Sequence, residues 1–362
     1  MSLPQASDRP PRAGLVAPGL RARVRAFGRR HGRKLWWVHT TYALGLGAFV
    51  ATFAQKGFDH ARWLVVSIVA VWVVVVFFFR YFGAGASQDV AVAWATRRLH
   101  FVALTYVLKN LYQGMLFFLL PFSAKSATLG GPTQWATVVL GVLALLSTLD
   151  VVFDRVLMRF RAAASAFYAF TLFAAANLAI PALFPSTRTL YALLGAAVLS
   201  VLGVFTLHLP ARALGRGVTW LAVGASALAA MGGVYLGRRA IPPVPMYVTT
   251  AAVGPSLLDD GRLAVEATTL HVSVIQRLVA ITDVVVPGGT GDRLVHVWRR
   301  DGEELYRAPD PATAVTGKDD VVRLRSTIDA GALPTHLAGP WTVDVETEDG
   351  QLVGRASFRV ID

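Results

Sequence analysis

The sequence predicts an α-helical polytopic membrane bundle of about seven transmembrane helices, followed by an all-β immunoglobulin-like sandwich domain. Seven apolar stretches predict the bundle, because a helix needs roughly 20 apolar residues to cross a hydrocarbon core about 30 Å thick. Basic residues in alternate connections indicate that these stretches cross a membrane in turn. Short runs of alternating polarity, separated by turn residues, predict the sandwich that follows.

The expected spans are separated by polar or basic connections. They are Leu35–Phe53, Trp63–Phe79, Phe101–Phe122, Trp135–Leu157, Ala163–Phe184, Leu190–Leu209 and Val218–Leu236. Pro121 is expected to break the third helix, because proline has no backbone N–H to donate within a helix. In the seventh span, small residues recur at every fourth position and favour packing against another helix of the chain over dimerisation. They are Ala225, Ala229, Gly233 and Gly237.

The basic residues have a sidedness that orients the chain. The amino-terminal tail and the even-numbered connections hold 17 Lys and Arg, whereas the opposite side holds 6. Short loops rich in Lys and Arg stay in the cytoplasm. We therefore expect a bacterial inner-membrane protein with a cytoplasmic amino terminus and a periplasmic carboxyl-terminal domain.

The chain divides into four expected parts: a basic disordered tail (1–34), the bundle (35–239), a Pro-rich connector (240–254) and the sandwich (255–362). Residues 1–242 carry 24 Lys and Arg against 5 Asp and Glu, whereas residues 243–362 carry 11 against 17. The positive charge thus belongs to the membrane part, which argues against nucleic acid as a partner and favours anionic lipid beside the tail. The absence of cysteine excludes disulfides and thiolate sites.

Polar residues within the third and fourth spans form a candidate site, since a charge inside a bilayer costs at least about 2.5 kcal/mol. They recur at helical spacing and are Tyr106, Lys109, Asn110, Gln113, Ser147, Asp150 and Asp154. Lys109 and Asp150 are expected at similar depth. The cluster indicates either a buried ion pair that fixes helix register, which is the preferred interpretation, or a path for a proton or solute.

Two hairpins are expected in the sandwich, one turning at Asp301 and Gly302 and the last one turning over 348–350. Two pairs of side chains are candidates for contact with a ligand or partner. They are His296 with Trp298, and Arg323 with Arg325. Each pair also has an ordinary structural explanation, as a core aromatic and as the solvated face of a half-buried strand.

No catalytic residues, metal ligands or cofactor sites are predicted. The eight histidines are dispersed along the sequence, which contains no HExxH pair, GxSxG elbow or GxxxxGK[ST] loop. The seventh span also lacks the lysine that a retinal Schiff base would need. These patterns give no positive indication of an enzyme.

Four runs carry a resemblance to a known family: LYQGMLFFLLPF, LLSTLD, HVWRRDGEEL and GPWTVDVETEDGQLVGRASFRV. They resemble an uncharacterised bacterial membrane family that combines a DUF5924-like multi-span region with a carboxyl-terminal DUF2914-like β-domain. The resemblance implies this architecture and an inner-membrane setting, but no activity. The chain departs from similar domains in the region of Thr316 to Asp319, where they have a Gly-Gly-Arg run.

The expected function is therefore non-enzymatic, with the bundle anchoring an exported domain that binds an envelope protein or glycan. A first alternative is a small transporter, or an ion- or proton-conducting protein, that uses the cluster of Lys109 and Asp150. A second is a membrane enzyme that acts on lipid-linked substrates, with His39, His100 and Asp154 near the inner face.

Overall fold

The computed structural model describes part of the 362-residue chain: residues 41–42, 44–45, 47–50, 52, 63–82, 95–149, 153, 160–209, 213, 215–259, 261–287, 292–308, 312–313 and 321–362. The tail, most of the first expected span, Asp150 and Asp154 lie outside the described residues. Met1–Tyr42 and Ala43–Asp362 form separate compact units. The helices and the β-domain described below both belong to the second unit.

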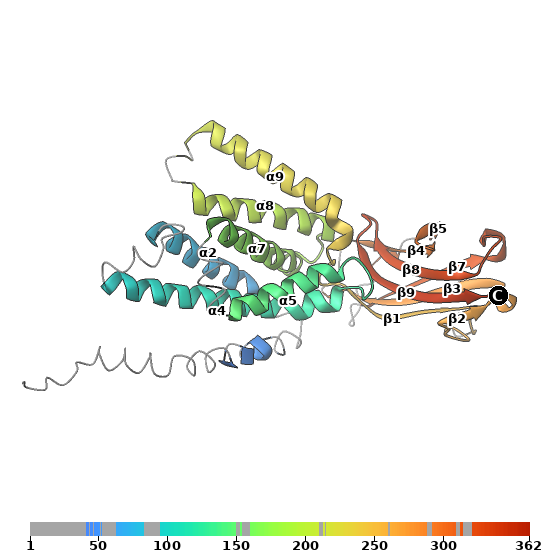
Figure 1. The fold of residues 1–362 in the computed structure, drawn as a ribbon. Helices are drawn as coiled ribbons and strands as arrows, with labels where there is room; N and C mark the ends of the chain where they lie inside the picture. The colour runs from blue at the N-terminus through green and yellow to red at the C-terminus, as the bar shows by residue number, and fades with distance from the viewer. Residues whose placement is uncertain are drawn as a thin grey trace, which may run out of the picture. The chain divides into compact units, whose positions relative to one another are not determined.

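The described helical region consists of long, mostly apolar helices. They are α2 (Trp63–Phe82), α4 (Ala95–Ser126), α5 (Gln134–Thr148), α7 (Arg161–Leu183), α8 (Thr189–His208) and α9 (Gly217–Gly237). Helices α2 and α4, α4 and α5, α7 and α8, and α8 and α9 pack as neighbours (Figure 1). The rings of Tyr112, Phe153 and Phe167 meet in the core of this region.

Two helices depart from their expected ends. Helix α4 continues through Pro121 to Ser126, so the prediction of a break was wrong; the proline φ is compatible with a helix, and only one backbone hydrogen bond is lost. Helix α5 ends at Thr148, with Leu149 extended. The hydroxyls of Ser147 and Thr148 donate to backbone carbonyl oxygens three residues earlier, and such bonds compete with the helical pattern.

Three of the described helices are long and apolar enough to cross a membrane: Ala162–Leu183, Thr189–His208 and Gly217–Ala240. The apolar helices Val65–Phe77 and Gln134–Thr148 are shorter. The structure therefore shows a helical amino-terminal region with three candidate spans, and the expectation of seven is not confirmed.

The small-residue stripe of α9 does not pack as predicted within the described unit. Ala225, Ala229 and Gly233 are exposed, and a Cβ added at Gly233 or Gly237 would meet no atom within 4 Å. Helix α9 contacts α8 instead through its other side, where Val223 is buried.

The β-domain is a sandwich of two sheets. Its strands are β1 (Tyr247–Gly254), β2 (Thr269–His271), β3 (Arg277–Val285), β4 (Arg293–Arg300), β5 (Glu303–Arg307), β6 (Ala312–Thr313), β7 (Val321–Asp329), β8 (Gly339–Thr347) and β9 (Leu352–Ile361). One sheet has the order β1-β3-β7 and the other β2-β9-β8-β4-β5, with β6 also paired to β4 (Figure 1). All pairs are antiparallel except that of β2 with β9.

Alternating residues of these strands fill the space between the sheets, as a period of two requires. Trp298 on β4, Trp341 on β8 and Phe358 on β9 pack with Leu278 and Ile328 of the opposite sheet. Both expected hairpins are present.

The turns of these hairpins use left-handed backbone. Asp301 and Gly302 connect β4 and β5 with φ of 50° and 86°, and Gly350 lies between β8 and β9 with φ of 79°. Such angles suit glycine, and the pair at 301 and 302 matches the turns favoured in two-residue hairpins.

The expected connector is largely structured. Tyr247–Gly254, assigned to it from the sequence, forms β1 and pairs along its length with β3. The sandwich thus begins about eight residues earlier than predicted, because the strand potential of these residues is realised only when β3 is available as a partner.

Candidate functional site

Residues of the β-domain complete the first turn of helix α8. A helix leaves its first backbone N–H groups without partners, and no side-chain capping bond is made by Arg188 at the start of α8. Instead, the N–H of Thr189 donates to Asp292 Oδ2 over 2.9 Å, and the Thr189 hydroxyl donates to Gln351 Oε1 over 2.7 Å. Asp292 and Gln351 are both buried. Polar groups of the sandwich therefore cap a helix of the helical region.

The β8–β9 hairpin also contacts the end of α9. Arg238 Nε donates to the carbonyl oxygen of Asp349 over 2.6 Å, and its guanidinium carbon lies 4.2 Å from the centre of the Tyr235 ring. In addition, Arg188 and Glu348 form an ion pair at 3.4 Å. These contacts fix the hairpin against the ends of two helices.

Three helix ends that the sequence predicts on one side of the membrane all lie beside the β-domain. Lys125 Nζ, near the end of α4, lies 5.6 Å from the centre of the Tyr247 ring. Arg188 directly precedes α8, and Arg238 directly follows α9. This placement agrees with helices that run in alternate directions. The compartment on that side stays a prediction.

A pocket of about 410 Å³ lies between these helix ends and the outer face of the six-stranded sheet. Its helical side is formed by Pro132, between α4 and α5, and by Arg239, next to α9. Its charged sheet residues are Arg299, Asp301, Asp344, Glu346 and Arg355. The volume falls within the range of about 300–1,000 Å³ that is common for small-molecule sites.

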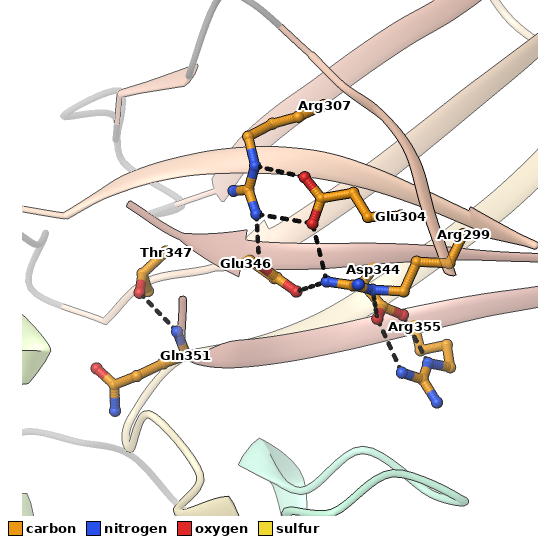
Figure 2. Close-up of polar contacts among 8 residues, drawn as sticks. All are labelled: Arg299, Glu304, Arg307, Asp344, Glu346, Thr347, Gln351 and Arg355. Carbon is orange, nitrogen blue, oxygen red and sulfur yellow. Dashed lines mark hydrogen bonds and ion pairs between the residues drawn. The ribbon is translucent and has the colours of Figure 1, made fainter. Parts of the chain in front are cut away.

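Asp344 is the most deeply buried charge of the pocket, at 2% side-chain exposure. Arg355 donates to it twice, from Nε to Oδ1 over 2.6 Å and from Nη2 to Oδ2 over 2.8 Å, and Arg299 Nε donates to Oδ2 over 3.1 Å (Figure 2). Paired bonds of this kind between arginine and carboxylate are short and strong. The hydrogen bond with Asp344 raises the pKa of Arg355.

The network continues through Glu346 to the edge strand β5. Glu346 accepts from Arg299 Nη2 over 2.7 Å and from Arg307 Nη2 over 3.1 Å. Arg307 also donates to both carboxylate oxygens of Glu304, as Figure 2 shows. The hydrogen bond with Arg307 lowers the pKa of Glu304, which favours the charged form of this carboxylate.

The intramembrane residues predicted from the sequence are divided by the structure. Lys109 and Gln113 on α4, and Ser147 on α5, are buried in the helical core. Tyr106 is about half exposed, and the Asn110 amide donates to the Tyr106 carbonyl oxygen over 2.7 Å. Because Asp150 and Asp154 lie outside the described residues, the pairing of Lys109 with Asp150 stays a prediction.

His296 and Trp298 lie between the two sheets. His296 Nδ1 is 2.8 Å from Ser326 Oγ, and Nε2 is 3.0 Å from Thr282 Oγ1. Trp298 Nε1 donates to the same Ser326 hydroxyl over 2.9 Å. Burial lowers the pKa of His296 to about 4. In this structure the pair belongs to the sandwich core, and its contact with a ligand stays a prediction.

Arg323 and Arg325 both lie on the exposed face of β7. Arg323 donates from Nε and Nη2 to the two carboxylate oxygens of Asp283 on the neighbouring strand β3, over 2.7 and 2.9 Å. Neither arginine lines the pocket described above. Contact of this pair with a partner stays a prediction as well.

Sequence reasoning missed the charged network, although the signal was present. In the run WTVDVE, Trp341, Val343 and Val345 alternate with Asp344 and Glu346, which places both carboxylates on the outer face. The register then sets Asp344 opposite Arg355 on β9 and Val297 on β4. Strand pairing across the sheet, which the alternation does not specify, brings the arginines to the carboxylates.

Two family models cover most of the chain. The model of a family of unknown function, DUF5924, matches residues 20–278, and that of a protein of unknown function, DUF2914, matches residues 291–360. The first match alone covers more than half of the chain. The chain belongs to the DUF5924 family. The resemblance to these two regions, in this order, is thereby confirmed, whereas a bacterial origin stays a prediction.

In this DUF5924 member, the two matches meet inside the sandwich. Strands β1 and β2 lie in the DUF5924 match, whereas β4 to β9 lie in the DUF2914 match. Each sheet contains strands from both, since β1 and β7 flank β3 and since β2 pairs with β9. The sandwich of this chain therefore includes the last part of the DUF5924 match. The chain has no significant match among curated proteins.

Proposed function

We propose that this DUF5924 member is a multi-pass protein of the bacterial inner membrane that holds its sandwich on the outer side. There the pocket binds an envelope component without catalysis. In this proposal the helical region crosses the membrane seven times, the amino terminus is cytoplasmic, and the sandwich is immunoglobulin-like in its topology.

The docking of the sandwich on the helix ends carries this proposal. Asp292, Gln351 and the hairpin over 347–351 contact α8 and α9, so the domain does not hang on a free connector. Helix α9 belongs to the candidate span Gly217–Ala240, and Arg239 near the end of this span lines the pocket. A binding site at this position would stand close to the membrane surface.

The orientation is tested by cysteine labelling, for which the cysteine-free chain is a clean background. Val265→Cys places a thiol at an exposed position of the β-domain, and Gly215→Cys places one in the connection between α8 and α9. In intact spheroplasts, a membrane-impermeant maleimide should label the first variant and not the second. If only Gly215→Cys is labelled, the orientation is the opposite of the proposed one and the proposed function is wrong.

Binding is tested by photocrosslinking in living cells. A photoreactive amino acid at Thr342, which lines the pocket, should yield a discrete adduct, whereas the same amino acid at Val265 serves as a matched control outside the pocket. The adduct should also weaken when Arg239 is changed to Gln. Equal adducts from both positions, or none from either, would contradict binding at this pocket.

A second candidate function is conduction of an ion or proton, which the burial of Lys109 and Gln113 in the helical core favours. Polar side chains inside a membrane region are costly and often mark a transport path. Flux into proteoliposomes is the test, with Lys109→Met as the variant and the exposed Lys125→Met as a control for loss of charge. Equal flux from all three proteins, at the level of empty liposomes, would remove this candidate.

A further inference from the structure

We infer that the pocket binds the phosphate group of a phospholipid headgroup, held by Arg239 at the end of α9 together with Arg355 and Arg299 on the sheet. This inference rests on the proposed function and names its ligand class. It follows from the balance of donors and acceptors, from the exposure of the charges, and from the position of Arg239.

The carboxylates of Asp344 and Glu346 on the pocket floor are already bound by arginines. Both oxygens of Asp344 and both oxygens of Glu346 accept bonds from arginines. Each arginine carries five N–H donors, and among the described residues the Nη1 groups of Arg299 and Arg355 have no hydrogen-bond partner. The network therefore presents unused guanidinium donors to a ligand, which suits an anion.

Exposure places the guanidinium groups above the carboxylates. Asp344 and Glu346 are 2% and 5% exposed, whereas Arg299 and Arg355 are 14% and 25% exposed. A molecule that reaches the pocket floor thus meets the guanidinium groups of Arg299 and Arg355 before the carboxylates of Asp344 and Glu346. The buried carboxylates fix these arginines in place, so little side-chain entropy remains to be lost on binding.

Arg239 adds a further cation to the pocket, and its charge acts on the nearby Glu304 carboxylate. It lines the pocket from the helical side, is exposed, and forms no hydrogen bond or ion pair with another described residue. Planar guanidinium groups match phosphate oxygens, and several of them commonly share one phosphate. Arg239 and the sheet arginines flank the same space of about 410 Å³.

The position of Arg239 favours a lipid as the source of the phosphate. Arg239 is the last residue but one of the candidate span Gly217–Ala240, so the pocket stands at the level where such a helix leaves the hydrocarbon. Headgroup phosphates occupy the same level. Asp301 on the opposite rim is 57% exposed and lies 3.4 Å from Arg300; the rim is thus locally neutral and leaves the arginines to attract the phosphate.

The test uses the purified full-length protein, stripped of lipid in detergent, and a soluble short-chain phosphatidylglycerol as the probe. Native mass spectrometry should show saturable binding to the wild type. Arg239→Gln should weaken binding at least about tenfold, as expected for the loss of a hydrogen bond to a charged group. Arg239→Lys keeps the positive charge but lacks the planar guanidinium group, so its affinity should lie between those of the wild type and Arg239→Gln. Arg325→Gln removes an exposed arginine outside the pocket and should leave binding unchanged.

Two further probes identify the source of the bound phosphate group. A short-chain diacylglycerol, which lacks phosphate, should not bind, and inorganic phosphate should compete only weakly. Equal binding by the wild type and Arg239→Gln, or by the diacylglycerol, would overturn the inference. If inorganic phosphate binds as tightly as the lipid, the conclusion that a lipid supplies the phosphate group is wrong. A crosslink from Thr342 to a molecule without phosphate would end this inference while leaving the proposed function standing.

Discussion

His296 is expected to make the sandwich sensitive to acid. The imidazole is 1% exposed and contacts only hydroxyl groups of Ser326 and Thr282 among the hydrogen-bond partners described. Trp298 Nε1 can only donate, so the Ser326 oxygen accepts from it and its own hydrogen can donate to His296. This arrangement holds a neutral imidazole with one donor and one acceptor nitrogen.

The magnitude follows from the difference between the folded and unfolded pKa of His296. Burial lowers the folded value to about 4 from an ordinary value of 6.5. Between these pH values the unfolded chain binds a proton that the folded chain does not, so stability is fully present above pH 6.5 and falls as the pH drops toward 4. At 1.36 kcal/mol for each pH unit, the expected loss is about 3 kcal/mol.

Amide hydrogen exchange of the full-length protein is the assay, with peptides from β4 and β7 as reporters and peptides from α7 as the internal reference. After correction for the intrinsic effect of pH, the free energy of opening of the two strands should fall by about 3 kcal/mol between pH 6.5 and 4. His296→Gln keeps hydrogen-bonding groups without a titratable one. It should lower stability at neutral pH and flatten the pH dependence. If the variant and the wild type lose protection in parallel on acidification, the reasoning about His296 is wrong.

Three further outcomes are expected. Asp292→Ala should remove the cap of α8 and destabilise its first turn by about 1 kcal/mol, seen as faster amide exchange there, while the exposed Asp259→Ala changes nothing; equal exchange in both variants would refute the cap. Asp344→Asn should destabilise the sandwich by about 1.5–3 kcal/mol, because it leaves two partly buried guanidinium groups without their anion, as measured by protection of β8 amides; a loss no larger than that of Asp259→Asn would show that the network contributes little. Asp150→Leu should lower the folded yield in size-exclusion chromatography, and Lys109→Leu added to it should restore that yield; equal loss in the single and double variants would refute their pairing.

The strands show which features of the fold local sequence patterns predict and which they do not. The hairpins around Asp301 and Gly350 were predictable, because alternation and glycine turns are local properties of the sequence. The role of Tyr247–Gly254 was not, since its pairing with β3 joins residues about 30 positions apart and competes with the equally plausible interpretation of a Pro-rich connector. The continuation of α4 through Pro121 and the end of α5 at Thr148 were missed for a related reason: single residues shift the balance of hydrogen bonds, which periodicity does not record.

The candidate site also depends on contacts that local sequence patterns do not predict. Alternation placed Asp344 and Glu346 on one face of β8, but only the register of β8 against β4 and β9 sets Arg299 and Arg355 beside them. Among the predicted residues, Lys109 and Gln113 lie buried in the helical core, and their role as a site stays a prediction. Their chemistry depends on neighbours from other helices.

The sequence by itself determined the family, the order of a helical region and a β-domain, and the two hairpins, because apolar length, alternation and turn residues act over a few neighbouring positions. The tertiary structure decided the rest. It joined Thr189 to Asp292 and Arg238 to Asp349, each more than 100 positions apart, and so created the pocket between the sheet and the helix ends. Such contacts form only when the free energy of the whole packed chain outweighs the entropy of bringing distant segments together.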